Sequence, residues 1–155
     1  MPVFSFFQWS KDHGHTLTGS GPLVSVEISI PTALKAHLSG KGLPIPAPQA
    51  GFALIDTGAF ATAVDQSIFD ALGIPPIDKI TTTTPHGASE SPVYPATVNF
   101  PGLDLVDLPM ERVIGCNLKW KSVEGKEIIM LLGRDLLQYF LLVYNGKSAD
   151  IFLAY

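Results

Sequence analysis

Residues 52–59 read FALIDTGA, an unbroken apolar run that ends at an acid followed by threonine and glycine. A short apolar run of this kind is typical of a strand buried within a sheet. It would place the Asp56 carboxylate on a tight turn, where Gly58 lets the backbone come close to a ligand or to a second chain. Two carboxylates within hydrogen-bonding distance cannot both ionise, so such a pair supplies a general acid and a general base in one site.

A second apolar run, at residues 128–132, leads into Gly133-Arg134-Asp135 about 75 positions later. The two motifs together resemble the retropepsin-like family of aspartic peptidases, the standard example of the paired-carboxylate effect. In that family a hydrophobic-hydrophobic-Gly segment packs beneath the catalytic loop, and an Arg begins the helix near the carboxyl end. The resemblance covers about residues 23–155 and implies an all-β fold, a closed acid-protease barrel with one or two short helices.

The resemblance also implies a role for each residue of the two motifs. Asp56 would be the catalytic carboxylate, Thr57 would hydrogen-bond across a dimer axis, and Gly58 would offer its backbone carbonyl to a substrate peptide. Ala59 and Phe60 would line the substrate site beside them. The residues that support the loop from below would be Leu131, Leu132, Gly133, Arg134 and Asp135.

Two positions of the second motif have further interpretations. In viral members the Arg is tied to an acid a few residues after the catalytic one, but here that neighbourhood reads FAT at residues 60–62. Arg134 would therefore find another acceptor, such as Asp65, Asp70 or a backbone carbonyl, or remain solvated. Asp135 can also be explained as an acid favoured at a helix start by the helix dipole alone.

Only one Asp-Thr-Gly occurs in the chain, whereas the mechanism of the family uses two. The second would come from another copy, and a symmetric homodimer is the simplest arrangement. By resemblance, the terminal strands would interleave in this dimer; the alternative is that their apolar residues pack within their own chain. The interface residues expected here are Ile151, Leu153 and Tyr155, together with Phe4, Phe6 and Trp9.

Alternating apolar residues predict a strand over residues 23–30 that Pro31 ends, and a short helix is expected at residues 32–38. Asp65 can cap a helix that runs to Leu72 and ends at Gly73. Farther along, the patterns predict a long hairpin and a carboxyl-terminal hairpin. The segments of the two hairpins are strands at residues 80–84 and 94–100 with turn residues 85–92, and strands on either side of Asn145-Gly146.

The tip of the long hairpin, PHGASE at residues 85–90, would form a flap that closes over a substrate. His86, Gly87 and Ala88 would then contact the substrate. An ordinary hairpin loop is the alternative interpretation.

The composition limits the partners and the location of the chain. A length of 155 residues predicts a single domain over residues 1–155, with residues 1–22 as an amino-terminal extension. The net charge of −4 argues against nucleic acid, and the small charged fraction of 15% suggests that a partner covers some apolar surface. The lone Cys116 excludes an internal disulfide and is read as a small buried hydrophobe.

Targeting and metal signals are weak in this sequence. The amino terminus lacks a secretory signal, and no apolar run approaches the roughly 18 residues of a membrane span, so we expect a cytoplasmic protein without a membrane partner. Asp12, His13 and His15 are read as exposed loop residues rather than metal ligands, and no metal or cofactor is expected.

The sequence therefore predicts an aspartic endopeptidase in which paired Asp56 carboxylates activate water to hydrolyse a peptide substrate. The alternative is a catalytically silent dimerisation or peptide-binding module with the same fold. The intact Asp56 argues against that alternative, because like charges brought together would oppose assembly without a chemical need for them.

Overall fold

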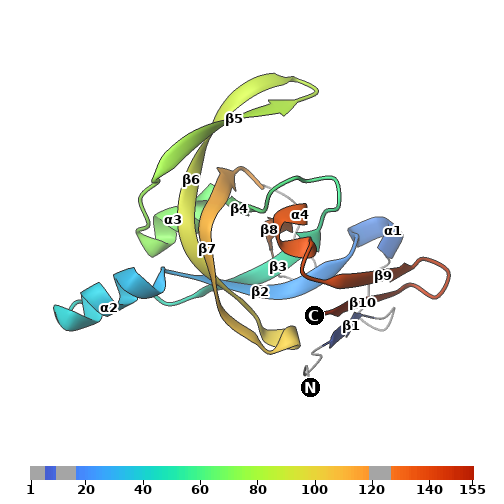
Figure 1. Cartoon of the computed structure of the whole chain (residues 1–155), viewed down its shortest axis with the longest axis horizontal. Helices are drawn as coiled ribbons and strands as arrows, with labels where there is room; N and C mark the ends of the chain where they lie inside the picture. Colours follow the sequence, from blue (N-terminus) through green and yellow to red (C-terminus); the bar gives the residue numbers. More distant parts are fainter. Residues whose placement is uncertain (1–5, 10–16, 119–126) are drawn as a thin grey trace.

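The computed structural model describes residues 6–9, 17–118 and 127–155, so that Phe4, Asp12, His13 and His15 lie outside the described residues. Its strands form one large sheet and one small sheet, connected by short helices (Figure 1). The elements in chain order are β1 (Phe6–Trp9), α1 (Leu17–Ser20), β2 (Leu23–Ser29), α2 (Thr32–Gly40), β3 (Gln49–Ile55), β4 (Ala63–Asp65), α3 (Gln66–Leu72), β5 (Asp78–Thr84), β6 (Gly87–Phe100), the 3-10 helix η2 (Pro101–Leu103), β7 (Leu105–Cys116), β8 (Ile128–Leu132), α4 (Arg134–Leu137), β9 (Leu141–Asn145) and β10 (Asp150–Ala154).

The large sheet closes into a barrel. Its strands follow the order β2-β3-β8-β4-β7-β6-β5, and β2 also pairs with β6, so that the first six strands form a ring. The alternation of β2 points Val24, Val26 and Ile28 into this ring, where each is at most 1% exposed. The prediction of an all-β closed barrel with few helices is confirmed.

β8 is the strand that brings the two motifs together. It lies between β3, with which it runs parallel, and β4, with which it runs antiparallel. Four of its five residues are buried, as an unbroken apolar run predicts for a strand covered on both faces. The parallel pairing carries Ile55 beside Leu132, so the Asp56 loop and the Gly133 turn leave the barrel at the same end.

α3 confirms the predicted helix and its caps. The Asp65 carboxylate accepts from the Ser67 amide at 3.0 Å, and Gly73 ends the helix in the left-handed conformation with φ of 66°. Phe69 and Leu72 are buried against the barrel.

The turn of the long hairpin is shorter than the sequence predicted. The strands pair from Asp78 with Val93 up to Thr84 with Gly87, so the chain turns at Pro85 and His86 alone. The prediction of a turn over residues 85–92 was wrong for residues 87–92. Cross-strand pairing with the threonine-rich β5 supplies partners that outweigh the local turn preference of glycine, serine and proline.

The small sheet has the order β1-β10-β9 and contains the chain's carboxyl-terminal hairpin. Asn145 pairs with Asp150, so the connecting loop spans residues 146–149 rather than Asn145-Gly146. The Asn145 side chain stabilises this longer loop by accepting from the Ser148 amide at 3.2 Å. Ile151 and Leu153 are 1% and 0% exposed, so they pack within their own chain and cannot supply a dimer interface.

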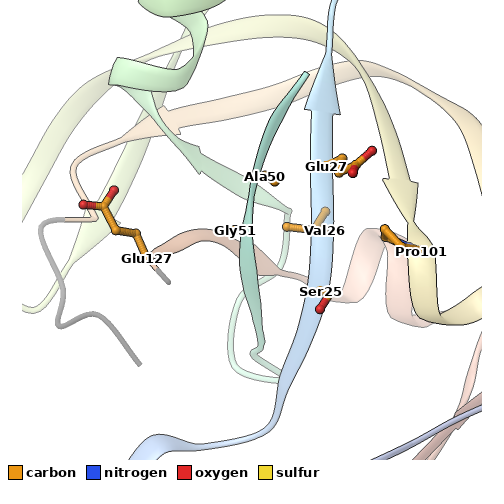
Figure 2. A pocket seen from close by; sticks show the side chains of 7 residues that line it. All are labelled: Ser25, Val26, Glu27, Ala50, Gly51, Pro101 and Glu127. Carbon is orange, nitrogen blue, oxygen red and sulfur yellow. The ribbon is translucent and has the colours of Figure 1, made fainter. Parts of the chain in front are cut away.

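A pocket of about 490 Å³ lies on β2 and β3, with Glu27 and Glu127 at its rim (Figure 2). Beneath this pocket, Gly51 of β3 lies very close to the backbone of Glu127, the residue before β8. A Cβ at Gly51 would lie 2.7 Å from the Glu127 carbonyl oxygen, so glycine permits this contact. None of the lining residues belongs to the Asp56 loop. None of the helices within the described ranges is both long and apolar enough to cross a membrane.

Candidate active site

The Asp56 loop begins where β3 ends and is fixed to β8 at its first residue. The Asp56 amide donates to the Leu132 carbonyl at 3.0 Å, which continues the parallel pairing by one residue. The loop then turns through Thr57 and Gly58 and returns to the barrel at β4. Leu131 pairs with Leu54 on one side and with Ala63 on the other, so β8 supports both ends of the loop.

The Asp56 carboxylate is held by its own loop. Its Oδ1 accepts from the Gly58 amide at 2.9 Å and from the Ala59 amide at 3.2 Å. A Cβ at Gly58 would lie 3.1 Å from the same oxygen, so glycine permits this close contact. Asp56 is half-buried, which leaves its carboxylate reachable from outside the chain.

Arg134 holds three successive carbonyl groups of the loop. Its Nη1 donates to the Thr57 carbonyl at 2.8 Å and to the Gly58 carbonyl at 3.1 Å, and its backbone amide donates to the Ala59 carbonyl at 2.9 Å. The sequence left Asp65, Asp70 or a backbone carbonyl open as the acceptor for Arg134, and in the structure backbone carbonyl groups accept from it. The Gly58 carbonyl oxygen has a second lone pair, so it can still accept from a substrate amide.

Asp135 has a larger role than the helix-dipole interpretation gave it. Its carboxylate accepts from the Leu136 amide at 2.9 Å at the start of the helix, but also from Thr62. The Thr62 amide donates to both carboxylate oxygens at 2.9 Å, and its hydroxyl donates to Oδ1 at 2.7 Å. Thr62 is fully buried. Sequence reasoning did not single out Thr62, because nothing local distinguishes it from other threonines.

At Gly133 the chain after β8 passes very close to the backbone that follows the Asp56 loop. Its amide donates to the Thr62 hydroxyl oxygen at 3.2 Å. A Cβ at this position would lie 2.4 Å from the Ala61 carbonyl carbon and 2.7 Å from the Thr62 nitrogen. Real Cβ atoms do not come this near to backbone atoms, so glycine is required by space rather than by backbone angles.

The substrate contacts that the sequence predicts are Phe60, beside the Asp56 loop, and the tip of the hairpin of β5 and β6. The Phe60 side chain is 61% exposed beside the Asp56 loop. The ribbon of β5 and β6 stands out from the barrel on the side where α4 and the Asp56 loop lie, with His86, Gly87 and Ala88 at its tip (Figure 1). The structure thus brings together Asp56, Thr57, Gly58, Ala59 and Phe60 with the second motif.

The base of this ribbon is tied to the barrel by an ion pair. Arg112 on β7 donates to the Asp78 carboxylate on β5 at 2.7 Å. The hydrogen bond from Arg112 and the one from the Lys79 amide hold the pKa of Asp78 below its ordinary value. The pair is half-exposed, so it orients the ribbon more than it stabilises the fold.

Comparisons with known proteins give one family match and a similar solved structure. The profile of the aspartyl protease family matches residues 49–136, a segment that contains both motifs. No curated protein matches the chain. The solution structure of Simian Foamy Virus (mac) protease is similar, with 18% sequence identity and a TM-score of 0.44 over 76% of this chain and 93% of that chain. The family match covers more than half of the chain, which therefore belongs to the aspartyl protease family.

Proposed function

We propose that the protein is an aspartic endopeptidase whose active site forms between two copies of the chain, each of which contributes Asp56. The observation that carries this proposal is the loop itself. It presents a half-buried carboxylate, and Arg134 holds the three carbonyl groups that follow it. A carboxylate positioned this firmly is suited to chemistry that depends on alignment.

The reaction is direct hydrolysis of a peptide bond. The charged Asp56 takes a proton from water, and the neutral Asp56 of the second copy protonates or polarises the scissile carbonyl. Water is the nucleophile, so no covalent intermediate with the enzyme forms. Thr57 hydrogen-bonds across the axis between the two copies and keeps both loops in place.

The peptide substrate lies between the loop and the hairpin ribbon. The Gly58 carbonyl accepts from a substrate amide, and Ala59 and the exposed Phe60 line the cleft beside it. His86, Gly87 and Ala88 close over the peptide as a flap and exclude water from the reacting bond. The residues that support the site from below are Leu131, Leu132, Gly133, Arg134 and Asp135.

Cleavage of a mixed peptide library between pH 3 and pH 8 tests the proposal, with Asp56→Asn as the inactive variant. Asparagine keeps an oxygen that can accept from the Gly58 amide, so the loop is preserved while the ionisable group is lost. Asp104→Asn makes the same change at an exposed turn position and serves as the control. We expect cleavage by the native chain and by the control only. Equal cleavage by Asp56→Asn would rule out the proposed chemistry, and no cleavage by a folded native dimer would favour the silent module.

A further inference from the structure

Three hydroxyl groups gather on one face of the ribbon that β5 and β6 form. The Thr82 hydroxyl donates to the Ser89 carbonyl at 3.2 Å, and its oxygen lies 3.2 Å from each of the Ser89 and Ser91 hydroxyl oxygens. We call Thr82, Ser89 and Ser91 the hydroxyl cluster. Each hydroxyl has one donor and two lone pairs, so these contacts leave the cluster with further donors and acceptors.

The hydroxyl cluster lies on the more buried of the two faces of the ribbon. Directly opposed residues share a face, and side chains alternate along a strand. Thr82 pairs with Ser89, and Ile80 pairs with Ser91. Thr82, Ile80 and Ser91 are half-buried, whereas Ser89, nearer the tip, is exposed. The residues on the other face include Lys79, Thr81, Thr83 and Glu90, which are all exposed. The face that carries the hydroxyl cluster is therefore the inner face of the ribbon.

The inner face continues across the sheet to the Asp56 loop. Val93 shares this face with Ser91 by alternation along β6. The cross-strand pairs that lead on from it are Val93 with Ile114, Ile114 with Ala63, Ala63 with Leu131, and Leu131 with Leu54. Asp56 follows Leu54 by two residues, and Ile55 between them belongs to the barrel core. The Asp56 carboxylate and the hydroxyl cluster therefore lie on the same side of the sheet, outside the barrel core.

The residues between the loop and the ribbon on this side of the sheet are apolar. Val93, Ala63 and Ile114 are 1%, 8% and 9% exposed, and Leu54 and Leu131 are half-buried. The ribbon itself stands out from the barrel on the side where α4 lies (Figure 1). A peptide side chain that points toward the barrel thus meets aliphatic carbon, and one that points toward the ribbon meets hydroxyl groups.

We propose that the hydroxyl cluster determines substrate specificity, so that the enzyme prefers peptides with asparagine or glutamine at the position that faces Thr82. This proposal rests on the proposed function, because it concerns a peptide held between the Asp56 loop and the ribbon. An amide side chain both donates and accepts, as the hydroxyl cluster does. An aliphatic side chain at this position would remove water from the hydroxyls without replacing its hydrogen bonds, which opposes binding.

A charged side chain fits the hydroxyl cluster less well than an amide. The charges of the ribbon are already paired: Lys79 with Glu90 at 3.8 Å on the other face, and Asp78 with Arg112 at 2.7 Å at the base. The hydroxyl cluster itself is uncharged. Covering a charge without an opposite charge beside it costs more free energy than covering a neutral polar group.

Thr82→Val tests the proposal, because valine keeps the branched shape of threonine and lacks the hydroxyl. Thr81→Val makes the same change on the exposed face of the same strand and is the matched control. Each chain is given a peptide library that is randomised on both sides of the scissile bond, and the products are identified by mass spectrometry. At one position we expect the native chain and Thr81→Val to prefer asparagine or glutamine over leucine about tenfold in kcat/KM, and Thr82→Val to lose this preference.

Peptide binding separates this proposal from the proposed function. Fluorescence anisotropy compares an asparagine peptide with its leucine counterpart on Asp56→Asn, with and without Thr82→Val. Cleavage with the same profile for the native chain and Thr82→Val would overturn the role of the hydroxyl cluster, while the proposed function stands. If the native chain cleaves nothing, but Asp56→Asn prefers the asparagine peptide and loses this preference with Thr82→Val, the specificity stands and the proposed function fails. Neither cleavage nor a binding preference would overturn both.

Discussion

Thr62 and Asp135 are joined by three hydrogen bonds, although 73 residues separate them in the sequence. The amide and the hydroxyl of Thr62 both donate to the Asp135 carboxylate, which lies at the start of α4. This contact fastens the end of the Asp56 loop to the helix that carries Arg134. The site is thus braced on both sides, by Arg134 along the loop carbonyls and by Asp135 where the loop re-enters the barrel.

Removal of the Asp135 carboxylate should destabilise the fold. Asp135→Ala leaves two buried donors of Thr62 without an acceptor, so we expect a loss of about 2–4 kcal/mol in the free energy of unfolding. Asp135→Asn keeps one acceptor and should lose less. Urea denaturation measures both, with Glu111→Gln as a control at an exposed carboxylate. A loss no larger than that of the control would show that the contact contributes little.

Gly133→Ala should strongly destabilise the fold, because the added Cβ would overlap the backbone of Ala61. Overpacking usually costs about 1–3 kcal/mol, and backbone cannot yield as a side chain does, so we expect a loss above that range. Gly40→Ala is the matched control, since a Cβ there meets nothing within 4 Å. Thermal unfolding compares the two variants, and equal melting temperatures would contradict the close crossing.

Ala59→Ser should move the pH optimum of cleavage toward acid. The Ala59 amide already donates to the Asp56 carboxylate at 3.2 Å, and a serine hydroxyl at this position would add a donor to the charged form. The pH profile of kcat/KM, measured for both chains on one peptide, shows the shift. An optimum that stays in place or moves to higher pH would show that the hydroxyl does not reach the carboxylate.

The Cys116 thiol should be inert in the folded chain. Burial, with a smaller contribution from Asp65, raises its pKa from 9.0 to about 12. At pH 8 we expect alkylation by iodoacetamide to be much slower for the folded chain than for the chain in urea, because the thiolate is the reacting form. The same shift keeps the proton on the folded chain after the unfolded chain has lost it, so stability should fall as the pH rises from 9 toward 12. Equal labelling rates in both states would contradict the partial burial of this thiol.

The sequence predicted the parts of the fold that rest on short-range patterns. Alternation placed β2, and local caps placed α3 between Asp65 and Gly73. Pairing across the sheet determined what local patterns could not. It extended β6 through residues 87–92 and lengthened the loop after Asn145, because both depend on the register with a neighbouring strand.

The sequence predicted the two motifs of the site but not the hydrogen bonds that connect them. The Arg134 acceptors and the Thr62 contact depend on how β8 passes beneath the loop, and no local signal in the sequence specifies this. Ile151 and Leu153 were expected at an interface because the resemblance implied interleaved terminal strands and these residues are the apolar members of an alternating pattern. Alternation shows only that one face of a strand is covered, and here the chain's own barrel covers it.

The need for two Asp56 side chains is tested most directly by mixing native chain with Asp56→Asn at a constant total concentration. If each active site takes one carboxylate from each copy, only native pairs cleave, and at equal amounts random pairing leaves about a quarter of the native activity. The account therefore predicts that activity falls as the square of the native fraction. A linear fall, with half of the activity left at equal amounts, would show that each chain cleaves alone and would contradict the shared site.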